Sequence, residues 1–158
     1  MECSKECSTC ISTCGMECPI CHKKGINVSF DTVLSLSKTL KFKMSSNYYI
    51  CTNPICDVAY FSDDGQIIKK DEVKVDIWFK KNNKNYIVCY CRNIHLKDII
   101  KAVTALDDVT KENIIKYLEK DKIETNCLVN NPLGKNCDIL FQNAIEYALK
   151  IKNQQKED

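Results

Sequence analysis

Four close pairs of cysteines constrain this chain more than any other feature of its sequence. A pair that is brought together with a second pair offers four thiolates. Four thiolates are the ligand set of a tetrahedral zinc ion or of a 2Fe-2S cluster. The sequence therefore predicts a fold built around two metal centres. The pairs are Cys18 and Cys21, Cys51 and Cys56, Cys89 and Cys91, and Cys127 and Cys137.

The compartment decides whether such cysteines bind metal or form disulfides, because thiols stay reduced in the cytosol and oxidise in secreted proteins. The chain has 12 cysteines in 158 residues. Its N-terminus, Met1-Glu2-Cys3, lacks the basic start and apolar core of a signal peptide, and no apolar run approaches the ~18 residues of a membrane span. We therefore expect a cytoplasmic protein without a membrane span, whose thiols bind metal.

The first two pairs predict one zinc site. Cys18-Pro19-Ile20-Cys21 is followed by Gly25, and a C-x2-C sequence that closes on a glycine turn lets both sulfurs face one ion. In the second pair, Asn53-Pro54 supplies the turn between the thiols. Buried free thiols without metal are the alternative. The predicted zinc ligands are Cys18, Cys21, Cys51 and Cys56.

The other two pairs predict a 2Fe-2S cluster. Cys89 and Cys91 can direct their sulfurs to the same side of an extended segment, because side chains alternate along a strand. Cys127 and Cys137 bracket an Asn131-Pro132-Leu133-Gly134 turn, and two cluster cysteines stand just before predicted helices. The positive N-terminal end of a helix would stabilise an anionic cluster. The predicted ligands are Cys89, Cys91, Cys127 and Cys137.

The N-terminal segment holds four more cysteines, spaced 4, 3 and 4 residues apart, and they allow several interpretations. A terminal segment without a fixed site is one. On a helix, this spacing would line the thiols along one face and offer a soft-metal site for Cu(I) or further zinc. The start of the segment also matches the cluster spacing of radical S-adenosylmethionine enzymes, whose large barrel this chain has no room for. These residues are Cys3, Cys7, Cys10 and Cys14.

Hydrophobic patterning predicts an α+β fold: a small β-rich zinc-binding subdomain over residues 16–80 and a helical 2Fe-2S-binding subdomain over 86–152, after a Cys-rich tail of residues 1–15. A polar boundary loop, 80–85, separates the two subdomains. In the first we expect strands at 27–30, 48–50, 58–61 and 73–79, with one helical turn or a loop after Asp31. In the second we expect helices through 96–103, from Thr110, and from Asp138, before a frayed tail at 152–158.

Several function classes have no support in the sequence. A net charge of +2 with interspersed lysines and acidic residues does not provide the basic surface that nucleic-acid binding needs. The chain has no P-loop, no G-x-G-x-x-G and no nucleophile elbow. Neither His22, in a knuckle turn, nor His95, at a helix start, stands in a catalytic arrangement. We expect no enzyme, apart from electron transfer of the kind that a metal reductase performs.

In this order and spacing, the four cysteine motifs resemble the N-terminal, iron-sulfur-binding part of CopZ-like copper chaperones, over most of residues 16–140. The helical half is also similar to the 2Fe-2S domain of the bacterioferritin-associated ferredoxin type. The resemblance implies the same zinc and cluster ligands as above. The chain departs from it in two ways: Thr125 and Asn136 stand where relatives have further cysteines, and the C-terminal copper-transfer domain with its M-x-C-x2-C motif is not expected.

These observations predict an iron-sulfur and zinc protein for one-electron redox or copper trafficking. A copper ATPase or a redox protein would be its partner. The protein would also bind Cu+ as a further metal. The alternative is a non-catalytic interaction module in which zinc and the cluster only hold the fold, since metal can supply folding energy in small domains.

Overall fold

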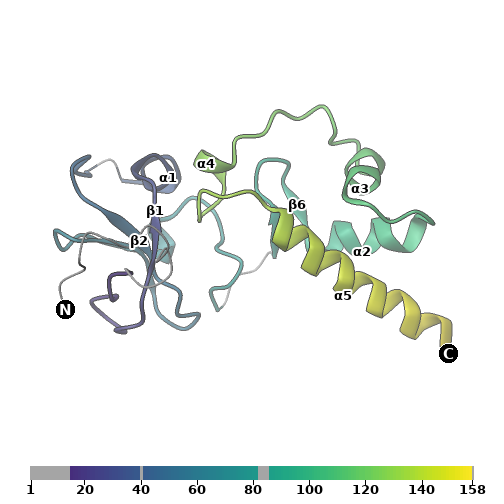
Figure 1. Cartoon of the computed structure of the whole chain (residues 1–158), viewed down its shortest axis with the longest axis horizontal. Helices are drawn as coiled ribbons and strands as arrows, with labels where there is room; N and C mark the ends of the chain where they lie inside the picture. Colours follow the sequence, from purple (N-terminus) through teal and green to yellow (C-terminus); the bar gives the residue numbers. More distant parts are fainter. Residues whose placement is uncertain (1–14, 40, 82–85, 158) are drawn as a thin grey trace, which may run out of the picture.

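The computed structural model describes residues 15–39, 41–81 and 86–157, and it confirms the α+β class. Figure 1 shows the strands of the N-terminal half on one side and most of the helices on the other. The first half contains β1 (Ile26–Val28), α1 (Phe30–Leu36), β2 (Tyr48–Ile50), β3 (Val58–Ser62), β4 (Ile67–Lys69) and the 3-10 helix η1 (Lys70–Glu72). The second contains β5 (Ile87–Cys89), β6 (Ile94–His95), α2 (Leu96–Ala105), α3 (Lys111–Tyr117), α4 (Cys127–Asn130) and α5 (Asp138–Glu157).

The first half is an antiparallel sheet in the order β1-β2-β3-β4. Strand β3 is buried along its whole length, and Tyr60 lies opposite Ile50 on β2. The predicted strands at 48–50 and 58–61 are thus confirmed, and they pair as a hairpin. Cys51 directly follows β2, and Cys56 precedes β3 by two residues.

Helix α1 is longer than the single turn that the sequence predicts. Ser29 is its N-cap, with a side-chain oxygen that accepts a hydrogen bond from the Asp31 N–H at 3.2 Å. Val33 and Leu36 are buried against the sheet. A serine cap followed by apolar residues at helical spacing therefore sufficed for two turns.

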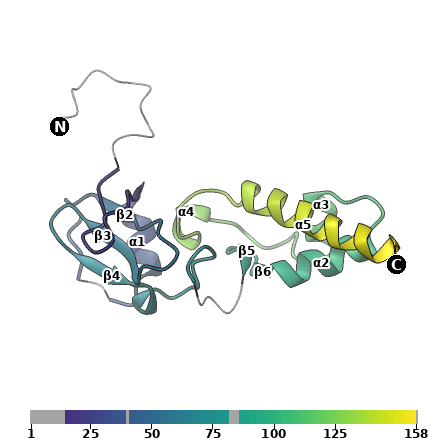
Figure 2. The same cartoon turned by 90° about the horizontal axis from the view of Figure 1, so that it is seen from below.

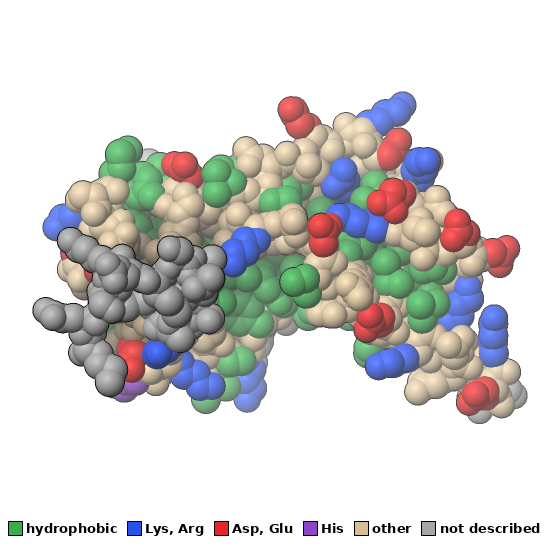
Figure 3. All heavy atoms as spheres, viewed as in Figure 1, with side chains coloured by type: hydrophobic (Ala, Val, Ile, Leu, Met, Phe, Trp, Pro, Cys, Tyr) green, Lys and Arg blue, Asp and Glu red, His purple; other side chains and the backbone are tan. Residues whose placement is uncertain are grey.

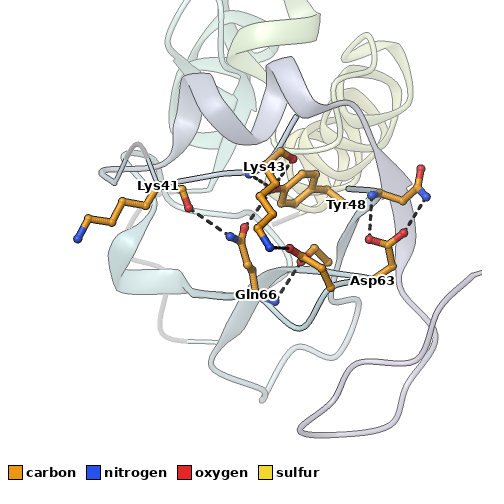
Figure 4. A network of polar contacts seen from close by, with 8 residues as sticks. Lys41, Lys43, Tyr48, Asp63 and Gln66 are labelled. Atoms are coloured by element: carbon orange, nitrogen blue, oxygen red, sulfur yellow. Dashed lines mark hydrogen bonds and ion pairs between the residues drawn. The ribbon is translucent and has the colours of Figure 1, made fainter. Parts of the chain in front are cut away.

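The end of the sheet remote from the cysteines is closed by a polar network (Figure 4). The Tyr48 hydroxyl accepts from the Lys43 N–H at 3.1 Å and lies 3.0 Å from both the Lys43 carbonyl and Gln66 Oε1. Asp63 accepts two hydrogen bonds from Asn47. These contacts tie the segment before β2 to the turn after β3, so a buried tyrosine keeps its polar atom satisfied.

The predicted strand over 73–79 is wrong. Within the described part of the chain, the only β pairing of this segment is an isolated bridge between Val73 and Ser37. The Tyr90 hydroxyl instead forms hydrogen bonds with the backbone of this segment. It accepts from the Trp78 N–H at 3.2 Å and donates to the Asp76 carbonyl at 2.6 Å. A side chain from the other half thus replaces a neighbouring strand, which an alternating pattern cannot reveal.

Two helices of the second half, α3 and α5, begin where the sequence predicts, whereas α4 was not predicted. The Thr110 hydroxyl accepts from the Asn113 N–H at 3.1 Å, as an N-cap should, and α5 starts at Asp138. The predicted fraying of 152–158 is wrong as far as Glu157, because α5 continues to that residue. Lys152 fixes this end of α5 by donating to the Val103 and Leu106 carbonyls at 2.7 and 2.8 Å.

The two halves meet where α4 lies against α1 (Figures 1 and 2). Thr32 on α1 donates to the Leu128 carbonyl at 2.6 Å, and the Tyr60 hydroxyl donates to the Pro132 carbonyl at 2.7 Å. Gly134 has φ +64°, and a Cβ at this position would stand 2.5 Å from Thr32 Oγ1. The turn after α4 therefore needs glycine both for its conformation and for the close approach of α1.

Charged side chains are distributed over both halves. On the face shown in Figure 3, lysines, arginines and acidic residues are interspersed along the helical half. Among the described residues, no helix is both long and apolar enough to cross a membrane.

Replacing Tyr60 by phenylalanine tests the contact between the halves. The variant leaves the buried Pro132 carbonyl without its donor. We expect the free energy of unfolding to fall by about 1 to 3 kcal/mol, the cost of an unsatisfied buried polar group. Urea unfolding at saturating zinc measures it.

Tyr49→Phe is the matched control, on the adjacent strand. The Tyr49 ring stacks on Phe61 at 5.6 Å between centroids, and within the described part of the chain its hydroxyl makes no hydrogen bond. This variant should unfold like the wild type. Equal stability of both variants would show that the Tyr60 contact contributes nothing.

Candidate metal centres

The first knuckle is a tight turn that directs two sulfurs the same way. The Cys18 N–H donates to the Lys23 carbonyl and the His22 N–H donates to the Cys18 carbonyl, both at 2.9 Å. His22 takes a positive φ of 61° to complete this turn, and Gly25 packs against β2 and Phe61 with no room for a Cβ. The C-x2-C sequence and the glycine thus act as predicted.

The second knuckle is shaped by Asn53 and by a lysine that the sequence analysis placed in a polar boundary loop. The Cys56 N–H donates to the Asn53 carbonyl at 3.2 Å. Lys80 is only 4% exposed, and its ammonium donates to the Asn53 and Cys56 carbonyls at 2.8 and 3.2 Å. A buried cation therefore stands behind the sulfurs of this knuckle, where it favours negative charge. No motif pointed to it, since the contact spans 24 or more residues.

The two knuckles bring four sulfurs together as the sequence predicts. All four lie within 4.8 Å of one another, and Cys21 Sγ is 3.6 Å from Cys51 Sγ. Two sulfurs on one tetrahedral zinc stand about 3.8 Å apart, given a bond of about 2.3 Å. The donor set is all-thiolate and mostly buried, so it fits zinc without rearrangement. The set is Cys18, Cys21, Cys51 and Cys56.

The surroundings of these thiols lower the pKa of one of them and raise the pKa of two others. Burial disfavours the Cys21 thiolate, but hydrogen bonds from the Lys23 backbone, the Asn53 side chain and two neighbouring thiols outweigh it and lower the pKa of Cys21 to about 6. Burial raises the pKa of Cys51 to about 12 and also raises the pKa of Cys56. One ligand is therefore already a thiolate near neutral pH, and others must release protons to bind metal.

The second set of thiols comes from three segments. Cys89 ends β5, and Cys91 lies in the turn that follows, in which Asn93 has φ 50°. Cys127 begins α4, a helix that the sequence did not predict, and Cys137 directly precedes α5, as predicted. The expected helix start directly after Cys91 is wrong, because strand β6 comes first and α2 begins only at Leu96.

These four thiols form two pairs rather than one compact group. Cys91 Sγ lies 3.8 Å from Cys127 Sγ, and the interaction of Cys89 with the Cys137 thiol is the main cause that lowers the pKa of Cys89. The described residues contain a single group of sulfurs that all lie within 4.8 Å of one another, and it is the first set. The second arrangement suits two metal ions with two thiolates each better than one tetrahedral ion.

Burial divides the second set into an inner and an outer pair. Cys89 and Cys137 are each 3% exposed, whereas Cys91 and Cys127 are half-buried. The hydrogen bond from Cys137 is the main reason that the pKa of Cys89 falls to about 5, and that same bond, together with burial, raises the pKa of Cys137. Of the inner pair, Cys137 is therefore the thiol that must release a proton to bind a metal.

Hydrogen-bond donors surround this second set, and the motifs did not point to them. Asn130 Nδ2 lies 3.7 Å from Cys91 Sγ, and Asn131 Nδ2 lies 3.5 Å from Cys137 Sγ. The Arg92 backbone and its guanidinium also lower the pKa of Cys89. The sequence analysis used Asn131 only as a turn residue.

The remaining cysteines of the prediction, Cys3, Cys7, Cys10 and Cys14, lie outside the described residues. The histidines belong to turns: His22 completes the first knuckle, and His95 precedes α2, where its N–H donates to Asp98 Oδ2 at 2.9 Å. Neither is part of the group of metal-binding side chains found in the described residues.

Comparison with known proteins gives the same picture. Residues 15–74 match the zf_CopZ family, described as a zinc binding domain. The copper chaperone CopZ of Archaeoglobus fulgidus is 28% identical over 123 residues, which are 77% of this chain and 58% of that protein. The chain thus spans little more than half the length of this relative.

A solved structure is also similar. It is the X-ray structure of the N-terminal domain of Archaeoglobus fulgidus CopZ, with a TM-score of 0.63 and 28% identity, over 81% of this chain and 96% of that one. The similarity therefore extends beyond the zinc-binding residues into the helical half. The resemblance to CopZ-like proteins is confirmed, while the resemblance to bacterioferritin-associated ferredoxins stays a prediction.

The pKa shifts predict how zinc affinity depends on pH. Above pH 6, Cys51 and Cys56 must each release a proton, so log affinity should fall by at least about 2 per pH unit of acidification. Below pH 6, Cys21 is protonated too, and one further proton must leave. The slope should therefore steepen by about 1 there. Competition with a chromogenic zinc chelator over this pH range measures it.

Cys127→Ser is the control, because it changes a thiol of the second set only. It should keep both the zinc affinity and the pH slope, while Cys56→Ser should weaken zinc binding at every pH. A slope that stays constant through pH 6 would contradict the low pKa of Cys21.

Proposed function

Starting from a CopZ-like chain with a zinc binding domain over residues 15–74, we propose that this protein transfers single electrons in metal handling, with copper as the metal. The observation that carries the proposal is the arrangement of the second thiol set: two pairs of sulfurs, one buried and one half-buried. A 2Fe-2S cluster held by Cys89, Cys91, Cys127 and Cys137 would supply the one-electron chemistry.

In this proposal, the buried and the half-buried cysteines of the second set have different roles. The buried Cys89 and Cys137 keep one side of the site away from water, which limits oxidation and loss of metal. The half-buried Cys91 and Cys127 form the side from which an electron can leave to a partner. Zinc at the first set holds the sheet and α1, and these hold the segment between Cys127 and Cys137 through Tyr60 and Thr32.

The copper step balances as a one-electron reaction. The reduced protein gives one electron to Cu(II), which becomes Cu(I), and a redox partner protein restores the electron. Thiolates prefer Cu(I), so the proposed acceptor is the N-terminal group Cys3, Cys7, Cys10 and Cys14, with a copper ATPase as the onward partner. A reducing compartment such as the cytoplasm would keep these thiols available.

The contacts between the halves support a second candidate. The turn after α4 is fixed to the sheet by a buried hydrogen bond, which would also suit an interaction module whose metals are only structural. The two candidates differ in whether the second site changes its redox state under conditions that a cell provides. In neither do we assign a catalytic residue.

The first test is metal content after oxygen-free purification. We expect one zinc, two irons and two sulfides per chain, with the visible absorption of a 2Fe-2S protein. Cys137→Ser should lose iron and sulfide but keep zinc. The matched Cys56→Ser should lose zinc first. Colourless wild-type protein without iron would refute the cluster.

The second test is copper reduction. Protein that has been reduced and freed of reductant should convert Cu(II) to Cu(I), detected with a Cu(I)-specific chromogenic chelator, while the electron paramagnetic resonance signal of the reduced cluster disappears at one Cu(II) per chain. Free thiols also reduce Cu(II), so this loss of the cluster signal is the readout, and Cys137→Ser should not show it. Titration of Cu(I) into intact protein and into protein lacking residues 1–15 then tests the acceptor. Equal stoichiometry and affinity in both would exclude the N-terminal thiols, and a reduced protein that leaves Cu(II) unchanged would favour the structural alternative.

A further inference from the structure

Asn131 is a buried polar residue whose role exceeds that of a turn former. It follows α4, lies between Cys127 and Cys137, and is 2% exposed. Its side-chain oxygen accepts from the Leu133 N–H at 2.8 Å, and its carbonyl accepts from the Gly134 N–H at 2.7 Å. These two bonds make the turn, and an aspartate would make them equally well.

The amide nitrogen has a separate partner, the sulfur of Cys137 at 3.5 Å. Chemistry fixes which end of the amide faces the sulfur. A reversed amide would bring its NH2 group against the Leu133 N–H, donor against donor, and its oxygen against the sulfur. The arrangement therefore requires an amide, with the oxygen for the turn and the N–H for the thiolate.

A donor at this position acts on the redox balance of a metal bound to Cys137. When the metal site gains an electron, its sulfur ligands become more negative, and a hydrogen bond to them strengthens. Such a bond stabilises the reduced form more than the oxidised form, and hydrogen bonds to sulfur are a known determinant of iron-sulfur potentials. Because the contact is buried, solvent does not screen it.

We propose that Asn131 is a positioning residue which raises the reduction potential of the metal site at Cys137 through its Nδ2–H to sulfur hydrogen bond. The inference rests on the proposed 2Fe-2S function. Asn130 contributes less at Cys91, because its sulfur contact is longer, 3.7 Å, it is half-exposed, and its amide also donates to the Asn126 carbonyl at 3.0 Å.

Redox titration of the iron-loaded protein, followed by electron paramagnetic resonance of the reduced form, tests the proposal. Asn131→Asp keeps the turn oxygen and replaces the donor by an oxygen. We expect the ratio of reduced to oxidised protein at a fixed potential to fall at least about tenfold, which for one electron is about 59 mV. Asn131→Ala removes the donor without adding charge, and its ratio should also fall.

Asn136→Asp is the matched control, the same substitution directly before Cys137. Asn136 is exposed and its side-chain oxygen accepts from the Asp138 N–H at 3.3 Å, away from sulfur. We expect its ratio to change less than about threefold, because solvent screens an exposed charge. An equal fall in Asn136→Asp and Asn131→Asp would assign the effect to charge alone and overturn the proposal.

The remaining outcomes are also decisive. Unchanged potentials in both Asn131 variants, with normal iron and sulfide content, would overturn the proposal while leaving the proposed function intact. Loss of iron and sulfide in both variants would assign Asn131 to holding the turn and would equally overturn the tuning role. Wild-type protein without iron and sulfide would refute the proposed function, and the role of Asn131 would be refuted with it.

Discussion

The convergence of the Cys18, Cys21, Cys51 and Cys56 sulfurs within 4.8 Å is the constraint on which the first half depends. Its strands are three to five residues long, and sheets this small rarely persist without further support. Both ends of the β2–β3 hairpin are fixed by other means: the Tyr48 network at one end and the second knuckle at the other. The thiols of that knuckle repel each other once they lose their protons, so a cation is required to hold them together. Zinc supplies that charge, with help from buried Lys80.

The two sets of thiols are structurally coupled through short polar contacts. Tyr60 on β3 and Thr32 on α1 hold the segment that carries Cys127 and Cys137, and Tyr90, between the other two cysteines, holds the chain at Asp76 and Trp78. Each half therefore supplies side chains that fix the backbone of the other. Disorder in the first half would release the segment that carries Cys127 and Cys137, so the arrangement of the second thiol set depends on the first half.

Much of the fold and the convergence of the first four thiols were predictable from local chemistry. The Cys18-x2-Cys21 and Gly25 spacing, the Asn53-Pro54 turn and the Thr110 cap are short-range signals, in which sequence neighbours fix the backbone. The strand expected over 73–79 and the frayed tail were wrong for the opposite reason. The partners of those segments, Tyr90 and the carbonyls at the end of α2, lie 12 or more residues away, so no local pattern contained them.

The sequence by itself determined that eight sulfurs would be offered in pairs, that the first half would be a small sheet, and that helices would follow. Only the tertiary structure decided how the pairs combine: one compact group, and one set split into a buried and a half-buried pair. It also decided that Lys80 and Asn131 face metal ligands. The physical reason is that burial and long-range hydrogen bonds depend on the packing of segments distant in sequence, whereas turns and caps depend on adjacent residues.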